Sequence, residues 1–195
     1  MQRHIPNILS LSRVVLTPVF LYFLLFSTYN HAKLISAIIF TIASITDAFD
    51  GKIARKYGLE TRLGVFLDPL ADKFLVLSAF FSFVLLGDVH LWMVVLISFR
   101  DVIVTILRMI MEFKGITMIT SRAGKLKTIL QIIIINVIFM YLLLKAYGYT
   151  QYSEILEKYN VIYSLMLITT LVTVYTGLHY FYFNHKKLKT ILFNK

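Results

Sequence analysis

The stretch "TDAFDGKIARKYGLETRLGVFLDPLADK", residues 46–73, holds four of the six aspartates in the chain. Apolar segments flank it on both sides. An aspartate in a membrane-spanning helix costs about 2.5–3.5 kcal/mol at the bilayer centre and less towards its surface. Carboxylates placed close together also repel one another. The stretch therefore needs a compensating ligand, and it is the first candidate for a functional site.

The composition around this stretch is that of a membrane protein. The 195 residues are 58% hydrophobic and only 15% charged, with a mean hydropathy of +0.77, whereas soluble domains carry about 25% charge. The length fits a single domain over 1–195. The absence of cysteine excludes disulfides, a thiolate nucleophile and a zinc–cysteine site. The net charge of +10 fits anionic lipids and phosphate-bearing substrates, and in so apolar a chain it does not indicate nucleic acid.

Six segments have the length and apolar character of a transmembrane helix, which needs about 20 residues. They are 8–28, 34–54, 64–86, 91–112, 126–147 and 160–183. Lys and Arg gather at both termini and in alternate connections, so the positive-inside rule predicts both termini in the cytoplasm. We therefore expect an all-α, six-span protein of the inner (cytoplasmic) membrane, with the aspartates facing the cytoplasm. Residues 148–159 fit a short helix, a loop or part of the sixth span equally well.

Within the quoted stretch, the aspartates share helix faces with small residues. At about 100° per residue, each half of the stretch places its acids on one side of its helix. The two helices run antiparallel, so the inner acids lie at similar depth. The residues that share a face are Asp47, Asp50, Gly51 and Ala54 on the first helix, and Gly64, Asp68, Ala71 and Asp72 on the second.

Carboxylates that converge in this way favour a metal site. Oxygen ligands suit hard cations such as Mg²⁺ or Mn²⁺. Two pairs of carboxylates can hold two ions about 3.5–4 Å apart, an arrangement that clamps a phosphoryl group. The alternative for the aspartates is an ion or proton pathway, and the alternative for the glycines is close helix packing.

The spacing of these residues is highly specific, and it resembles the signature of the CDP-alcohol phosphotransferase family. Members transfer a phosphoryl-linked unit from a CDP-linked lipid to an alcohol and release CMP. The resemblance implies that the four aspartates bind two divalent ions and that Asp72 is also the general base. It further implies that the CDP pocket is lined by Gly51, Ala54, Arg55 and Gly64. The matching pattern is Asp47-x-x-Asp50-Gly51-x-x-Ala54-Arg55 followed by Gly64-x-x-x-Asp68-x-x-x-Asp72.

Three further stretches, at 5–13, 67–73 and 121–131, are similar to family members that use sn-glycerol 3-phosphate as acceptor and CDP-diacylglycerol as donor. A phosphate-bearing acceptor needs cationic partners besides the metals. We expect these to be Arg108, Arg122 and Lys125. Arg100 is a further candidate, with pairing to a nearby carboxylate as its alternative role, and Lys73 has the same two readings.

The resemblance also implies a homodimer in contact with membrane lipids. Other acceptors within the family stay open, namely phosphatidylglycerol, as in a cardiolipin synthase of the CDP-lipid type, and an inositol phosphate. Outside the family, a cation transporter or a non-catalytic membrane scaffold would use the same aspartates differently. Neither of these two alternatives predicts a nucleotide product.

Overall fold

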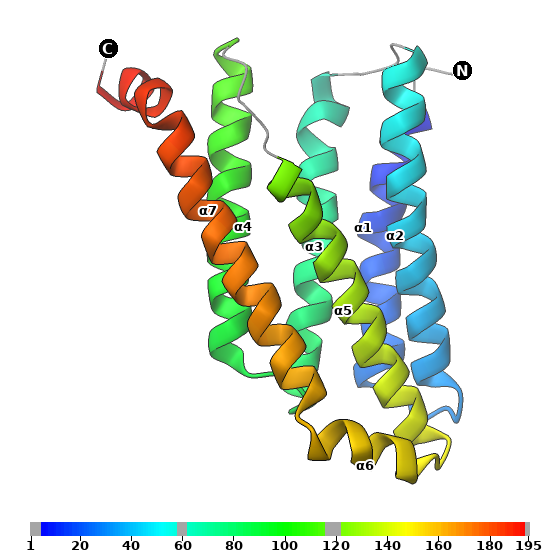
Figure 1. The fold of residues 1–195 in the computed structure, drawn as a ribbon. Helices are drawn as coiled ribbons and strands as arrows, with labels where there is room; N and C mark the ends of the chain where they lie inside the picture. The colour runs from blue at the N-terminus through cyan, green and yellow to red at the C-terminus, as the bar shows by residue number, and fades with distance from the viewer. Residues whose placement is uncertain (1–4, 58–61, 116–121, 194–195) are drawn as a thin grey trace.

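Every described element of the protein is an α-helix (Figure 1). The computed structural model describes residues 5–57, 62–115 and 122–193, and it describes side chains over 12–46, 70–111, 113–115, 124 and 126–185. The helices are α1 (Ile5–Leu25), α2 (Ala32–Tyr57), α3 (Arg62–Leu85), α4 (Leu91–Phe113), α5 (Arg122–Ala146), α6 (Thr150–Lys158) and α7 (Val161–Phe193).

The six predicted segments are all helical, with some differences in their ends. The helix predicted at 34–54 runs to Tyr57, and the one predicted at 160–183 runs to Phe193. Residues 148–159, which the sequence leaves open, contain the short helix α6. Among the described residues, Leu126–Ala146 and Val161–His185 are long and apolar enough to cross a membrane. The six spans and their orientation therefore stay predictions.

Helices α1–α5 and α7 stand side by side, and α6 lies across one end of the bundle (Figure 1). The start of α1 and the end of α7 lie at the opposite end. The end of α2, the start of α3, the end of α4 and the start of α5 lie there too. We call the end that holds these helix termini the acid-motif end, and the end that α6 crosses the α6 end. The helix ends that flank the basic connections thus lie at one end of the bundle.

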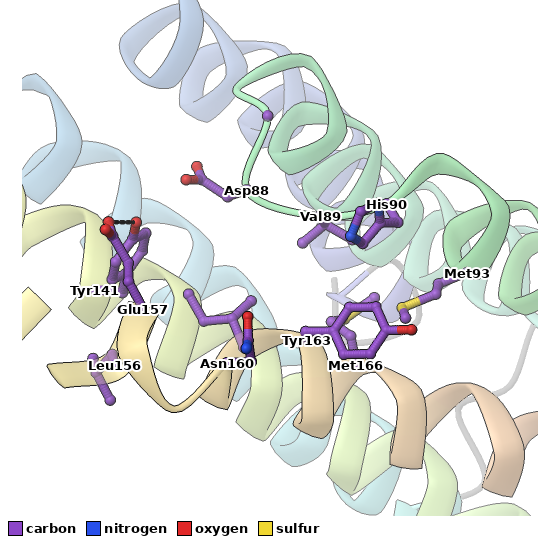
Figure 2. Close-up of a pocket in the computed structure, with 12 residues that line it drawn as sticks. Asp88, Val89, His90, Met93, Tyr141, Leu156, Glu157, Asn160, Tyr163 and Met166 are labelled. Carbon is purple, nitrogen blue, oxygen red and sulfur yellow. Dashed lines mark hydrogen bonds between the residues drawn. The ribbon is translucent and has the colours of Figure 1, made fainter. Parts of the chain in front are cut away.

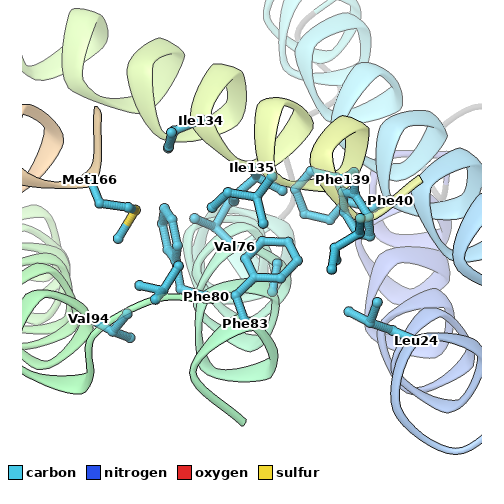
Figure 3. Packing of buried hydrophobic residues seen from close by; sticks show 14 of the residues in the cluster. Leu24, Phe40, Val76, Phe80, Phe83, Val94, Ile134, Ile135, Phe139 and Met166 are labelled. Atoms are coloured by element: carbon cyan, nitrogen blue, oxygen red, sulfur yellow. The ribbon is translucent and has the colours of Figure 1, made fainter. Parts of the chain in front are cut away.

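Aromatic and branched side chains fill the interior between the helices (Figure 3). Phe20 of α1 meets Phe40 of α2 edge to face, with ring centroids 5.9 Å apart. Phe83 of α3 meets Phe139 of α5 in the same way at 5.2 Å. Such pairs contribute about 0.5–1.5 kcal/mol beyond their burial. Along the described residues, α2 and α3 meet mainly through α1, which packs on both.

The outer surface of the bundle is apolar as well. Large side chains point outward along several helices, among them Phe99 of α4, which is 67% exposed, and Leu178 of α7, which is 66% exposed. Soluble monomers rarely expose apolar surface in large contiguous patches. The outside of this bundle is thus suited to a lipid environment.

The chain turns sharply where α6 meets α7. Asn160 has a φ of +48°, in the left-handed region that asparagine tolerates better than most residues with a side chain. Only Tyr159 and Asn160 separate the two helices. A single residue in an unusual conformation therefore sets the direction in which α7 leaves α6.

Candidate active site

The two halves of the acid motif, Asp47, Asp50, Asp68 and Asp72, lie on α2 and α3 at the acid-motif end of the bundle. Along α2, Asp47 and Asp50 precede the last helical residue by ten and seven positions. Along α3, Asp68 and Asp72 follow the first helical residue by six and ten positions. At about 1.5 Å per residue, Asp50 and Asp68 lie about 10 Å from the helix ends, and Asp47 and Asp72 lie about 15 Å from them. The acids of α2 therefore match those of α3 in depth, Asp50 with Asp68 and Asp47 with Asp72.

The connection between these helices is short. Residues 58–61 join Tyr57 to Arg62, and a chain of that length spans at most about 18 Å. The sequence predicts a connection of about ten residues; the helices extend further because the charged residues at their ends continue the helical backbone. The shorter connection therefore limits the distance between the ends of the two acid-bearing helices to about 18 Å.

Most of the predicted site side chains lie outside the described part of the structure. Among the residues with described side chains, no group of three His, Asp or Glu could hold a metal ion. Of the four metal-site aspartates, only Asp72 belongs to that part. The metal site therefore stays a prediction, supported by backbone register. The predicted residues whose side chains fall outside are Asp47, Asp50, Gly51, Ala54, Arg55, Gly64, Asp68, Arg122 and Lys125.

The described aspartate of the motif is ion-paired. Asp72 Oδ2 lies 2.8 Å from Lys73 Nζ, and the two side chains are 22% and 15% exposed. Of the two roles expected for Lys73, binding a phosphate or pairing with a carboxylate, the structure shows the pairing. Lys73 also interacts electrostatically with Asp101 of α4. The acid motif is thus connected to a charged group on a third helix.

A buried polar cluster surrounds Asp101, whose side chain is fully buried. Arg100 Nη1 lies 3.2 Å from Asp101 Oδ1, so Arg100 takes its alternative role of pairing with a carboxylate. Lys127 Nζ donates a hydrogen bond to the same oxygen. Gln131 Nε2 donates to the other oxygen, Oδ2, at 3.1 Å. The Asp101 carboxylate therefore joins α4 to α5 through two side chains, Lys127 and Gln131, and also pairs with Arg100 on its own helix.

The sequence reasoning missed Asp101 and did not select Lys127 and Gln131, although the stretch at 121–131 contains them. Two signals could have found them. Asp101 is an acid deep in an apolar helix, where a partner is needed. Lys127 and Gln131 are four residues apart, so they lie on the same face of α5.

Arg100 also depends on a close contact with α7. A Cβ atom at Gly177 would lie 2.7 Å from Arg100 Cγ and 3.3 Å from Arg100 Nε. Gly177 therefore leaves the space through which the Arg100 side chain passes.

Arg108, a predicted acceptor residue, is exposed. It lies about two turns, or about 12 Å along α4, closer to the acid-motif end than Arg100 does.

A second polar region lies at the α6 end, around a cavity of about 230 Å³ (Figure 2). Glu157 there accepts hydrogen bonds from Tyr141 and, at 3.1 Å, from Lys145. These bonds lower the pKa of the Glu157 carboxyl. Burial raises the pKa of Asp88, against the opposing effect of two lysines. The cavity lies at the other end of the bundle from the acid motif, so it does not belong to the predicted site.

Comparison with known proteins agrees with the motif. The CDP-alcohol phosphatidyltransferase family matches residues 3–175. A "CDP-diacylglycerol--glycerol-3-phosphate 3-phosphatidyltransferase" of Bacillus subtilis is 33% identical, over 96% of this chain and 98% of its own. A protein of the same name from Salmonella typhimurium is 40% identical, over 68% of this chain and 75% of its own.

A "probable phosphatidylglycerophosphate synthase" of Mycobacterium tuberculosis is 43% identical over 68% of this chain. The matched part spans 64% of that relative's length. The family match covers the acid motif and the buried polar cluster together, because both lie within residues 3–175. The chain belongs to the CDP-alcohol phosphatidyltransferase family.

Proposed function

We propose that this protein transfers the phosphatidyl group of CDP-diacylglycerol to sn-glycerol 3-phosphate, and that its products are phosphatidylglycerophosphate and CMP. The names of the relatives from Bacillus subtilis and Salmonella typhimurium support this donor and this acceptor. The observation that carries the proposal is the matched depth of the two acid pairs on α2 and α3. It is the arrangement that a reaction on a diphosphate needs, because charge neutralisation and positioning dominate phosphoryl transfer.

The donor set fits two divalent cations, Mg²⁺ or Mn²⁺. All four side chains of the acid motif are carboxylates, the ligands that hard cations prefer. Two pairs at matched depth suit two ions better than one. When bound, such ions neutralise the diphosphate of the donor and the charge that develops on the leaving oxygen.

The transfer itself needs one proton acceptor. The hydroxyl oxygen of glycerol 3-phosphate forms a bond to the phosphorus that carries the diacylglycerol. The bond between that phosphorus and the oxygen shared with CMP breaks, and CMP leaves with this oxygen. Asp72 accepts the hydroxyl proton. Lys73, 2.8 Å from Asp72, orients the carboxylate beside the reacting groups.

The binding residues follow from the family pattern. We assign the CDP pocket and the acceptor's phosphate site to side chains on α2, α3, α4 and α5, all near the acid-motif end. A CDP-lipid needs small residues where its bulky head group approaches the backbone. The assigned residues are Gly51, Ala54, Arg55 and Gly64 for the donor, and Arg108, Arg122 and Lys125 for the acceptor.

The proposed location is the inner membrane. The apolar outer surface and the two long apolar helices support insertion into a bilayer. The basic connections at the acid-motif end favour the cytoplasm for that end, where a water-soluble acceptor reaches the site. In this proposal α1–α5 and α7 are the six spans, and the protein is a homodimer as the family resemblance implies.

The test supplies one acceptor at a time to the purified protein. With CDP-diacylglycerol and Mn²⁺ or Mg²⁺ present, we expect CMP release with glycerol 3-phosphate and none with phosphatidylglycerol or inositol phosphate. The variant Asp68→Asn should remain folded and release no CMP. Release with phosphatidylglycerol but not with glycerol 3-phosphate would reject the acceptor. Cation flux in proteoliposomes without any nucleotide product would instead favour a transporter.

A further inference from the structure

The buried polar cluster carries more positive than negative charge. Three cations, Lys73, Arg100 and Lys127, lie beside two carboxylates, Asp72 and Asp101. In the proposed function Asp72 serves the metal site, so that among the described side chains Asp101 is the one carboxylate left beside the three cations. Buried charge without a counter-charge is strongly unfavourable. A phosphate monoester brings about −1.5 to −2 charges at neutral pH and would balance the surplus.

The cluster also contains polar atoms that lack a partner. Gln131 is fully buried, and its carbonyl oxygen Oε1 accepts no hydrogen bond within the described structure. Arg100 Nε is buried and donates none there either. A buried polar atom left unpaired costs about 1–3 kcal/mol. A hydroxyl group of a ligand could donate a hydrogen bond to Gln131 Oε1. A phosphate oxygen of the same ligand could accept one from Arg100 Nε.

The position of the cluster connects it to the reaction. Lys73 follows Asp72 directly in α3 and interacts electrostatically with Asp101, Arg100 and Lys127. A ligand bound by these cations would therefore lie next to the carboxylate that accepts the proton.

We propose that Asp101 is a positioning residue that holds Lys127 and Arg100 in place to bind the phosphate of the acceptor. This inference rests on the proposed function and adds two cations to the acceptor site. Asp101 acts through its neighbours, because its own oxygens are occupied by Lys127, Arg100 and Gln131. The phosphate would approach the side of each cation that faces away from Asp101.

The experiment measures CMP release while either glycerol 3-phosphate or CDP-diacylglycerol is varied. In Asp101→Asn we expect the KM for glycerol 3-phosphate to rise about tenfold or more, as for the loss of a charge-assisted contact. The KM for CDP-diacylglycerol should not change. Asp88→Asn at the α6 end is the matched control and should leave both KM values as they are. A folded Asp101→Asn protein with wild-type KM values would overturn the inference.

A double variant separates positioning from simple structural support. Asp101→Asn leaves Lys127 buried without its counter-charge, so the single variant can lose stability. Asp101→Asn combined with Lys127→Met removes both charges and should recover the melting temperature, while the KM for glycerol 3-phosphate stays raised. Recovery of that KM in the double variant would show that the pair is only structural. If the wild-type protein releases no CMP with glycerol 3-phosphate, the proposed function fails first and this inference fails with it.

Discussion

The contact between Gly177 and Arg100 allows a prediction with a defined sign. In Gly177→Ala the new Cβ atom would lie 2.7 Å from Arg100 Cγ, so the arginine must move and lose its contact with Asp101. A hydrogen bond between charged groups contributes about 1.5–3 kcal/mol, while alanine in place of glycine returns about 1 kcal/mol of helix propensity. The net loss of stability is therefore about 0.5–2 kcal/mol. For a chain of this size it corresponds to a fall in melting temperature of about 1–8 °C.

The assay is thermal unfolding of the purified protein in detergent, repeated in an Arg100→Ala background. Without the arginine side chain beyond Cβ, the clash is gone and only the propensity gain remains. Gly177→Ala should then stabilise the protein by up to about 1 kcal/mol. The reversal of sign between the two backgrounds is the critical result. Equal destabilisation in both backgrounds would refute the reasoning, because the effect would then come from another neighbour of Gly177.

Three further predictions concern other parts of the molecule. Chelation of divalent cations should abolish CMP release, and Mn²⁺ or Mg²⁺ should restore it; activity that survives chelation would contradict the role given to the acid motif. Thr41→Val removes a hydroxyl whose one proton is shared between the Ala37 carbonyl oxygen at 2.8 Å and Asn136 Oδ1 of α5 at 3.0 Å, so unfolding in detergent should show a loss of about 0.6 kcal/mol. Asp88 has a raised pKa because of burial, so its contribution to stability is full below its unfolded-state pKa and falls as the pH rises through the folded-state pKa. Asp88→Asn should therefore stabilise the protein at neutral pH and lose that advantage in acid, as melting temperatures measured across pH would show.

The sequence predicts the helices well because their apolar segments are long and separated by polar connections. It cannot resolve residues 148–159, because α6 has only nine residues and mixes charged and polar side chains with Tyr152, Ile155 and Leu156. It also ends two helices too early. The residues that directly follow Ala54 and Phe183 are charged or polar, so a search for apolar segments stops there, whereas the helices continue to Tyr57 and Phe193.

Part of the candidate site can be predicted from the sequence and part cannot. The acid motif can be found from sequence because its spacing on two neighbouring helices is unusual. The buried polar cluster cannot, because Asp101 and Lys127 are 26 positions apart and only the packing of α4 and α5 on α7 brings them together. Arg100 shows the same limit of sequence-based prediction. The sequence leaves its role open, and only the position of the Asp101 carboxylate in the structure shows that it forms an ion pair.

The sharp turn at Asn160 has a mechanical consequence. The helix that follows has 33 residues, so it acts as a lever about 50 Å long that pivots at one corner. A rotation of about 10° there would carry the tip roughly 9 Å sideways, and would carry Gly177, about 25 Å along, by roughly 4 Å. A displacement of that size is larger than the 2.7–3.6 Å that would separate a Cβ atom at Gly177 from the Arg100 side chain. The geometry around the reacting groups is therefore sensitive to a bend made at the far side of the protein.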